Sequence, residues 1–142
     1  ASAGDPNVAI NYCVRAIFSG ELSQHQLAAT YYNRGLEYKR KGDYEQTIKD
    51  FDSAILLRPG FVRALNSRGV TYFEMGEHKL AIEDFDAAIA HVEDQGVEVI
   101  HYEDTGHHSF AGRHAYFQDP DGNAVEIIDL HGYGTAGDPP AA

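Results

Sequence analysis

Histidines and carboxylates are concentrated in the last third of this 142-residue chain. Residues 91–142 hold 6 of the 8 histidines and 10 of the 22 Asp/Glu residues, but only one basic residue, Arg113. Here His114 and Tyr116 are followed along the chain by Glu126. Imidazole and carboxylate groups can together hold a divalent metal ion. The first hypothesis is therefore a metal site with Glu126 and His114 as ligands and Tyr116 beside them.

A hairpin is needed to bring these side chains together. Residues 113–118 and 124–130 each predict a strand, and the linker 119–123 between them contains Pro and Gly as strong turn signals. If Gln118 pairs with Ala124, four residues share one face of the sheet. The facing pairs are then Tyr116 with Glu126, and His114 with Ile128.

One more strand and a helix complete the predicted C-terminal part. A helical run continues past Ala90 and stops at Gly96, and residues 97–100 then predict a strand. The coarse prediction is a helix followed by three strands. The open edge of such a small sheet is suited to pairing two chains, so a homodimer through this edge is one expectation.

The segment 112–130 resembles the end of a vicinal oxygen chelate module, the superfamily of glyoxalases, extradiol dioxygenases and fosfomycin-resistance proteins. The resemblance implies that Glu126 stands where the last strand of a module commonly carries a metal-binding glutamate. It also implies that Tyr116 and His108 lie near the active-site tyrosine and upstream histidine of ring-cleaving dioxygenases. Ala115 departs from the signature, because a larger apolar residue is expected there.

The same resemblance implies an incomplete metal site. The superfamily builds its metal cup from two βαβββ modules, whereas this chain has one module that lacks its first strand. A complete site would need a second chain or another ligand, such as His101 or His107. Histidines on exposed strands and loops are also commonly plain surface residues. The strands would then be a structural cover without chemistry.

The part of the chain that must carry this segment is repetitive. Two stretches match at an offset of 34 residues, and the match stops near residue 90. A fixed period of this size indicates stacked units that bury a face only against their neighbours. The identical pairs at this offset are Arg34/Arg68, Gly35/Gly69, Tyr38/Tyr72, Gly42/Gly76, Ile48/Ile82, Asp50/Asp84, Phe51/Phe85, Asp52/Asp86, Ala54/Ala88 and Ile55/Ile89.

Each unit predicts two helices joined by a turn. Apolar and small residues recur at helical spacing, Gly42 and Gly76 mark the turns, and Pro59 follows the second helix of the first unit. The pattern resembles the tetratricopeptide repeat over about residues 4–90. Thr47 and Glu93 depart from it, where alanine and proline are usual.

An incomplete unit precedes these two. Residues 4–17 align with the second-helix part of the repeat, which predicts a single helix that caps the stack. Cys13 then fills the core position of an aromatic residue. A buried, small apolar role is expected for this thiol rather than a reactive one.

The tetratricopeptide resemblance implies that an extended peptide binds in a concave groove lined by the first helices. Asn side chains there can pair with a peptide backbone, and Lys39 and Arg63 can receive an acidic group. A solvated polar face is the alternative. The groove residues implied are Tyr32, Asn33, Leu36 and Lys39 from one unit, and Arg63, Asn66, Val70 and Phe73 from the next.

Charge and composition limit the partners. The net charge of −11 argues against nucleic acid and anionic membranes, and there is no apolar run long enough for a membrane span. Without a signal peptide on this sequence, a soluble protein of the cytoplasm or periplasm is expected. One cysteine excludes an internal disulfide and gives no compartment.

The sequence thus predicts an α+β protein: tetratricopeptide-type helical hairpins followed by a small antiparallel three-stranded β segment. The domains are residues 1–90, a partial oxygen-chelate-like part at 91–131, and a disordered tail at 132–142. The join resembles a chimera of two families, engineered, recombined or natural. The predicted function is a peptide-binding scaffold without catalysis or cofactor of its own. The alternative is a metal-dependent, glyoxalase- or dioxygenase-like enzyme completed by dimerisation.

Overall fold

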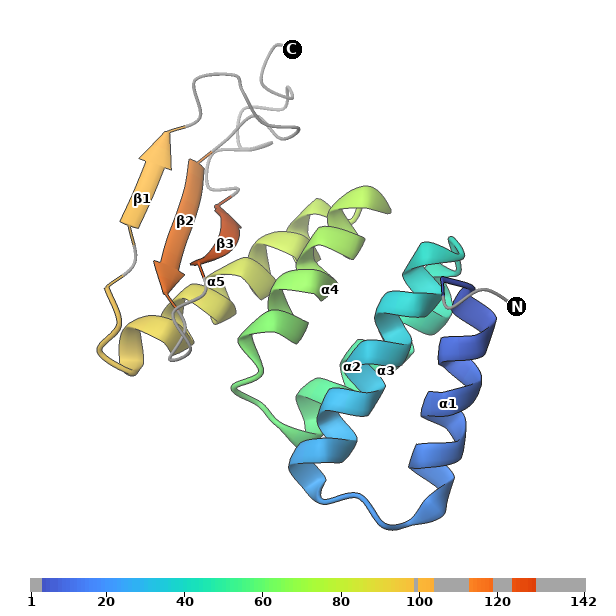
Figure 1. The fold of residues 1–142 in the computed structure, drawn as a ribbon. Coiled ribbons are helices and arrows are strands. Elements are labelled where there is room, and N and C mark those ends of the chain that lie inside the picture. Colours follow the sequence, from blue (N-terminus) through green and yellow to red (C-terminus); the bar gives the residue numbers. More distant parts are fainter. Residues whose placement is uncertain (1–3, 99, 104–112, 119–123, 130–142) are drawn as a thin grey trace.

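The computed structural model describes residues 4–98 with their side chains, and the backbone of residues 100–103, 113–118 and 124–129. His107, His108 and the tail 132–142 lie outside the described residues. Five helices are followed by three strands (Figure 1). Their bounds are α1 Pro6–Ser19, α2 Gln24–Arg40, α3 Tyr44–Leu57, α4 Val62–Glu74, α5 His78–Asp94, β1 Ile100–Glu103, β2 Arg113–Gln118 and β3 Ala124–Asp129.

Helices α2 and α3 begin at residues that the sequence marks for this role. Ser23 and Gln26 form a capping box at the start of α2, and the Asp43 carboxylate accepts a hydrogen bond from the backbone N–H of Gln46 at the start of α3. The turns inside the two hairpins need left-handed backbone, with φ of +79° at Gly42 and +83° at Gly76. Helices α2 with α3 and α4 with α5 therefore form two hairpins, as predicted.

A close contact between glycine and phenylalanine sets the separation of the helices in each hairpin. A Cβ atom on Gly35 would lie 2.8 Å from the Phe51 ring, and one on Gly69 would lie 2.8 Å from the Phe85 ring. Both phenylalanines are fully buried. The two contacts occupy equivalent positions in the two hairpins, so residues that repeat in the sequence also pack in the same way.

The core continues from one hairpin into the next. One cluster of buried residues joins Ala28 and Ala54 to Phe61 and Ala64, which belong to the entry and first turn of α4. A second cluster lies inside the hairpin of α4 and α5. Ile55 packs against both clusters. The stack is therefore one continuous core, although no unit can bury its own face alone.

Helix α1 is the single capping helix that the sequence predicts, and it packs against α2. Its buried residue is Ile10, whereas Cys13 is only half-buried. The expectation that Cys13 is a buried core residue is therefore wrong, because α1 is covered on one side only. Burial still raises the pKa of this thiol, with the nearby Arg34 acting in the opposite direction.

The strands lie in the order β1-β2-β3, all antiparallel. Gln118 pairs with Ala124, Tyr116 with Glu126, and His114 with Ile128, which is the predicted hairpin register. The predicted first strand at 97–100 is wrong, since β1 begins at Ile100. The reason is the end of α5, where the Val97 N–H still bonds to the Val92 carbonyl after a left-handed Gly96.

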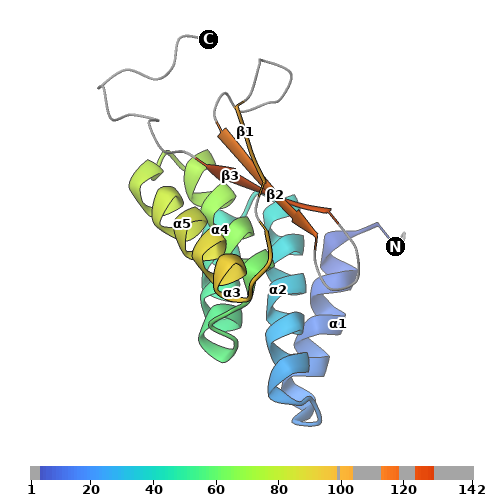
Figure 2. The same ribbon diagram turned by 90° about the vertical axis from the view of Figure 1, so that its left-hand side faces the viewer.

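The sheet stands at the α5 end of the stack, far from α1 (Figures 1 and 2). β3 lies against α5 and, to a smaller extent, against α4. Within the described residues, no helix is long and apolar enough to cross a membrane.

The glycine–phenylalanine contact predicts a specific loss of stability. Gly35→Ala should lower the free energy of unfolding through overpacking by about 1–3 kcal/mol, offset by up to about 1 kcal/mol of helix propensity. In a Phe51→Leu background the same change should cost less, because the ring that a new Cβ meets is gone. Urea unfolding followed by circular dichroism measures both costs. An equal cost in the two backgrounds would contradict the contact.

Candidate functional site: the face formed by the first helices

The eight predicted binding residues lie on the first helices of the two hairpins, α2 and α4. Two contacts join these helices directly. The hydroxyls of Tyr32 and Ser67 share a hydrogen bond of 3.3 Å, and the Lys39 ammonium lies 3.7 Å from the Glu74 carboxylate. On both helices the two contacts are seven residues apart, which is about 10 Å along the axis. We call the surface of α2 and α4 that includes these contacts the first-helix face.

Apolar residues lie between the two contacts. Leu36 follows Tyr32 by one turn on α2, and Val70 follows Ser67 by about one turn on α4. Both are partly buried, and Val70 packs against the core of its hairpin. The middle of the first-helix face therefore offers partly exposed aliphatic side chains.

The aromatic members of the predicted set also support the packing. The Tyr32 ring lies 5.6 Å from the Phe51 ring and 5.1 Å from the Phe61 ring, which ties α2 to the core. Phe73 makes an edge contact with the His78 ring at 5.0 Å. A ligand could therefore contact the hydroxyl of Tyr32 and the partly exposed edge of the Phe73 ring.

The polar members differ in exposure. Asn33 and Arg63 are exposed, whereas Asn66 is half-buried. Lys39 is half-buried and already faces Glu74. The sequence prediction named Lys39 but missed Glu74, which lies on α4 at the same level. The signal that would have predicted this pair is a cation on one first helix and a carboxylate on the next. The two residues are 35 positions apart, one more than the repeat period of 34.

Glu74 has a second partner. The Tyr44 hydroxyl, at the start of α3, interacts with the Glu74 carboxylate, whose negative charge raises the pKa of Tyr44. Glu74 therefore stands between a cation and a phenol that come from the preceding hairpin.

A buried ion pair lies behind the face in each hairpin. The Arg34 guanidinium donates to both carboxylate oxygens of Asp50 at 2.9 and 2.7 Å, and Arg68 binds Asp84 in the same way at 2.8 and 2.6 Å. Asp50 and Asp84 are almost fully buried. These bidentate pairs explain why the Arg and Asp residues recur at the repeat offset. The sequence analysis noted the identities but did not infer the pairing.

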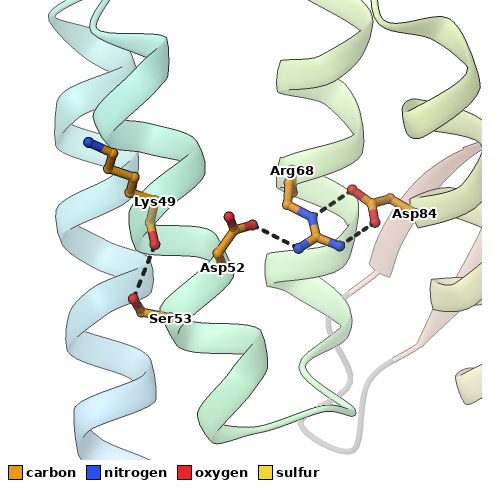
Figure 3. A network of polar contacts seen from close by, with 5 residues as sticks. All are labelled: Lys49, Asp52, Ser53, Arg68 and Asp84. Carbon is orange, nitrogen blue, oxygen red and sulfur yellow. Dashed lines mark hydrogen bonds and ion pairs between the residues drawn. The ribbon is translucent and has the colours of Figure 1, made fainter.

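Arg68 also reaches across the boundary between the hairpins. Its third nitrogen, Nη1, donates to Asp52 of α3 at 2.9 Å (Figure 3). The same picture shows Ser53 on α3, whose hydroxyl donates to the Lys49 carbonyl at 3.1 Å. The hydrogen bond to Asp84 raises the pKa of Arg68, although burial opposes this shift. Arg68 therefore stays charged and holds α3, α4 and α5 together.

The predicted metal ligands are described only by their backbone. The register places His114 and Glu126 on neighbouring strands, two residue pairs apart in the ladder. Among residues 4–98, whose side chains are described, no group of three or more His, Cys, Asp or Glu residues is arranged to hold a metal ion. The metal site thus stays a prediction.

Comparison with known proteins identifies the helical part. The family model of the tetratricopeptide repeat matches residues 28–61 and 62–94. The second match runs to the end of α5. Residues 28–94 therefore match the tetratricopeptide repeat twice, which agrees with the predicted repeat hairpins. A search of curated proteins gives no match. Neither comparison supports an oxygen-chelate module.

Solved structures agree with this assignment. Two crystal structures of MamA are each 29% identical, with TM-scores of 0.60 and 0.58, and the match covers 66% of this chain and 52% and 49% of theirs. A structure described as MamA MSR-1 C2 is similar in fold, with 20% identity, a TM-score of 0.56, and coverage of 63% and 49%. The chain thus spans about half the length of the solved structures that it matches.

The two carboxylates on Arg68 should contribute very differently to stability. Asp84→Asn removes the buried carboxylate that holds Arg68 in a bidentate pair, leaves only the half-exposed Asp52 as counter-charge, and should cost about 3 kcal/mol. Asp52 is half exposed, so Asp52→Asn should cost at most about 1 kcal/mol. Urea unfolding of the two variants measures the difference. Equal losses of stability in the two variants would contradict this prediction, because the Arg68–Asp52 contact would then contribute as much as the Arg68–Asp84 pair.

Proposed function

We propose that the first-helix face binds an extended peptide segment of a partner protein. The observation that supports this most directly is the pair of cross-contacts between α2 and α4. They join α2 and α4 at two points, and Leu36 and Val70, which lie between those points along the helices, are partly exposed. Tetratricopeptide repeats act in this way as scaffolds, and residues 28–94 hold two of them.

The dimensions of the face suit a short peptide. α2 has 17 residues and α4 has 13, so the shorter helix is about 20 Å long. An extended chain rises about 3.3 Å per residue, and the face can therefore accommodate roughly six residues. Leu36, Val70 and Phe73 would receive apolar side chains of such a segment.

Asn33 and Asn66 would hold the peptide backbone. A carboxamide both donates and accepts, so the exposed Asn33 of α2 can satisfy an N–H and a carbonyl of an extended chain. The Oδ1 of Asn66 on α4 is buried, so Asn66 would act on the peptide as a donor through its Nδ2. Recognition through the backbone would fix the direction of the segment while side-chain contacts select its sequence.

We further propose that residues 91–131 form a separate unit that covers the end of the stack. In support, α3 packs against α4 of the following hairpin, whereas α5, which no further hairpin follows, packs against β3. An edge-paired homodimer through this small sheet stays an additional hypothesis. Size-exclusion chromatography with light scattering would detect it.

The binding proposal predicts an effect of the two amides. On a peptide selected for binding to the intact chain, Asn33→Ala and Asn66→Ala should each weaken binding about 5- to 10-fold, because each loses hydrogen bonds worth about 1 kcal/mol. Fluorescence polarisation of the labelled peptide measures this. Asn11→Ala is the matched control, since Asn11 is an exposed asparagine on α1.

Two outcomes would contradict the placement of the peptide. One is a loss of binding in Asn11→Ala as large as in the other two variants. The other is unchanged affinity in the Asn33→Ala and Asn66→Ala double variant. Urea midpoints measured alongside separate lost binding from lost folding.

The oxygen-chelate alternative predicts a bound metal. On the backbone, Tyr116 pairs with Glu126 across β2 and β3. On this alternative, tag-free protein should contain divalent metal close to one ion per chain, and Glu126→Ala should lose it. Elemental analysis of both proteins measures the content. Metal that is retained in Glu126→Ala, or absent from both proteins, would contradict this alternative.

A further inference from the structure

We propose that the peptide segment bound on the first-helix face is acidic, and that one of its carboxylates takes Lys39 from Glu74. This inference rests on the proposed function and adds the chemical class of the ligand. Two observations support it: the distribution of charge between the first and the second helices, and the geometry of the weak Lys39–Glu74 ion pair.

Charge separates between the first and second helices. The first helices, α2 and α4, carry five basic and two acidic residues. The second helices, α3 and α5, carry two basic and eight acidic residues. Charge therefore disfavours an acidic segment less on the first helices than on the second ones.

Most of the basic groups on the first helices are already held. Arg34 and Arg68 are bound to buried aspartates. The Arg40 guanidinium lies 2.7 Å from Glu37 and donates to the Gly4 carbonyl at 2.9 Å. These three have short, well-aligned partners and are poor candidates for exchange.

Lys39 is different. Its ammonium lies 3.7 Å from Glu74, well beyond the about 2.7–2.9 Å of a strong charge-assisted hydrogen bond. Both side chains are partly exposed, at 24% and 32%. Pairs of this kind contribute little to stability. A peptide carboxylate can therefore replace Glu74 on Lys39 at low cost.

Glu74 is not left unpaired when Lys39 turns to the peptide. Its carboxylate still interacts with Tyr44. Lys39 also stands at the end of the apolar part of the face, two turns beyond Tyr32. The ligand that fits is an extended segment with apolar side chains over Leu36 and Val70 and an Asp or Glu close behind them.

The test is selection from a phage-displayed library of random 12-residue peptides against the full chain. Selected peptides should be enriched in Asp and Glu at least 2-fold over the starting library. Binding of an acidic peptide from this set should fall about 10-fold in Lys39→Gln and rise about 3-fold in Glu74→Gln. Selection against Lys39→Glu should instead enrich Lys and Arg.

Lys49→Gln is the matched control. Lys49 forms a comparable pair with Glu45 at 3.4 Å, but it lies on α3 among the acidic second helices. Its substitution should change affinity less than 2-fold. Peptides enriched without Asp or Glu, or equal effects of Lys39→Gln and Lys49→Gln, would overturn the acidic class and leave peptide binding intact. If no peptide is selected at all, the proposed function itself fails.

Discussion

The packing of the helical part depends on the contact between a glycine on each first helix and a phenylalanine on each second helix. At Gly35 and Gly69 there is no room for a Cβ atom, because the rings of Phe51 and Phe85 occupy that space. This lets the two helices approach closely enough for an arginine on one to reach an aspartate on the other. The bidentate pairs Arg34–Asp50 and Arg68–Asp84 then become possible, and they form in both hairpins at nearly the same distances.

The boundary between the hairpins is held by different means. Arg68 uses its third nitrogen on Asp52, Tyr32 packs on Phe61 and bonds to Ser67, and Lys39 faces Glu74. Three of these contacts join polar groups that are only partly buried. Such contacts can rearrange at lower cost than the glycine–phenylalanine core. The boundary between the hairpins is therefore the part of the helical stack where polar contacts can rearrange most easily.

The strongest ion pairs of the helical part join arginines to buried aspartates. The pKa of Arg68 is raised rather than lowered toward neutrality, so this arginine neither gives nor takes a proton at ordinary pH. Among the eight predicted binding residues, the polar ones are two amides, the exposed Arg63, the weakly paired Lys39 and the Tyr32 hydroxyl.

The sequence alone determined the repeat, the two hairpins and the capping helix. The reason is that helical spacing and turn glycines are local signals, and a period of 34 residues compares the chain with itself. The position of β1 was misplaced, because the exit from α5 uses residues that look strand-forming. The burial of Cys13 was misjudged because a helix at the end of a stack is covered on one side only.

Only the tertiary structure decided which polar groups meet. The recurrence of Arg and Asp was visible, but their distance of 16 residues spans a turn whose geometry sets the pairing. The pair of Lys39 and Glu74 joins two different hairpins, so no pattern within one unit contains it. Whether a lysine is free or weakly paired depends on the packing of neighbouring units. The sequence therefore gives the candidates for a binding face, and packing between the hairpins determines which of them a ligand can use.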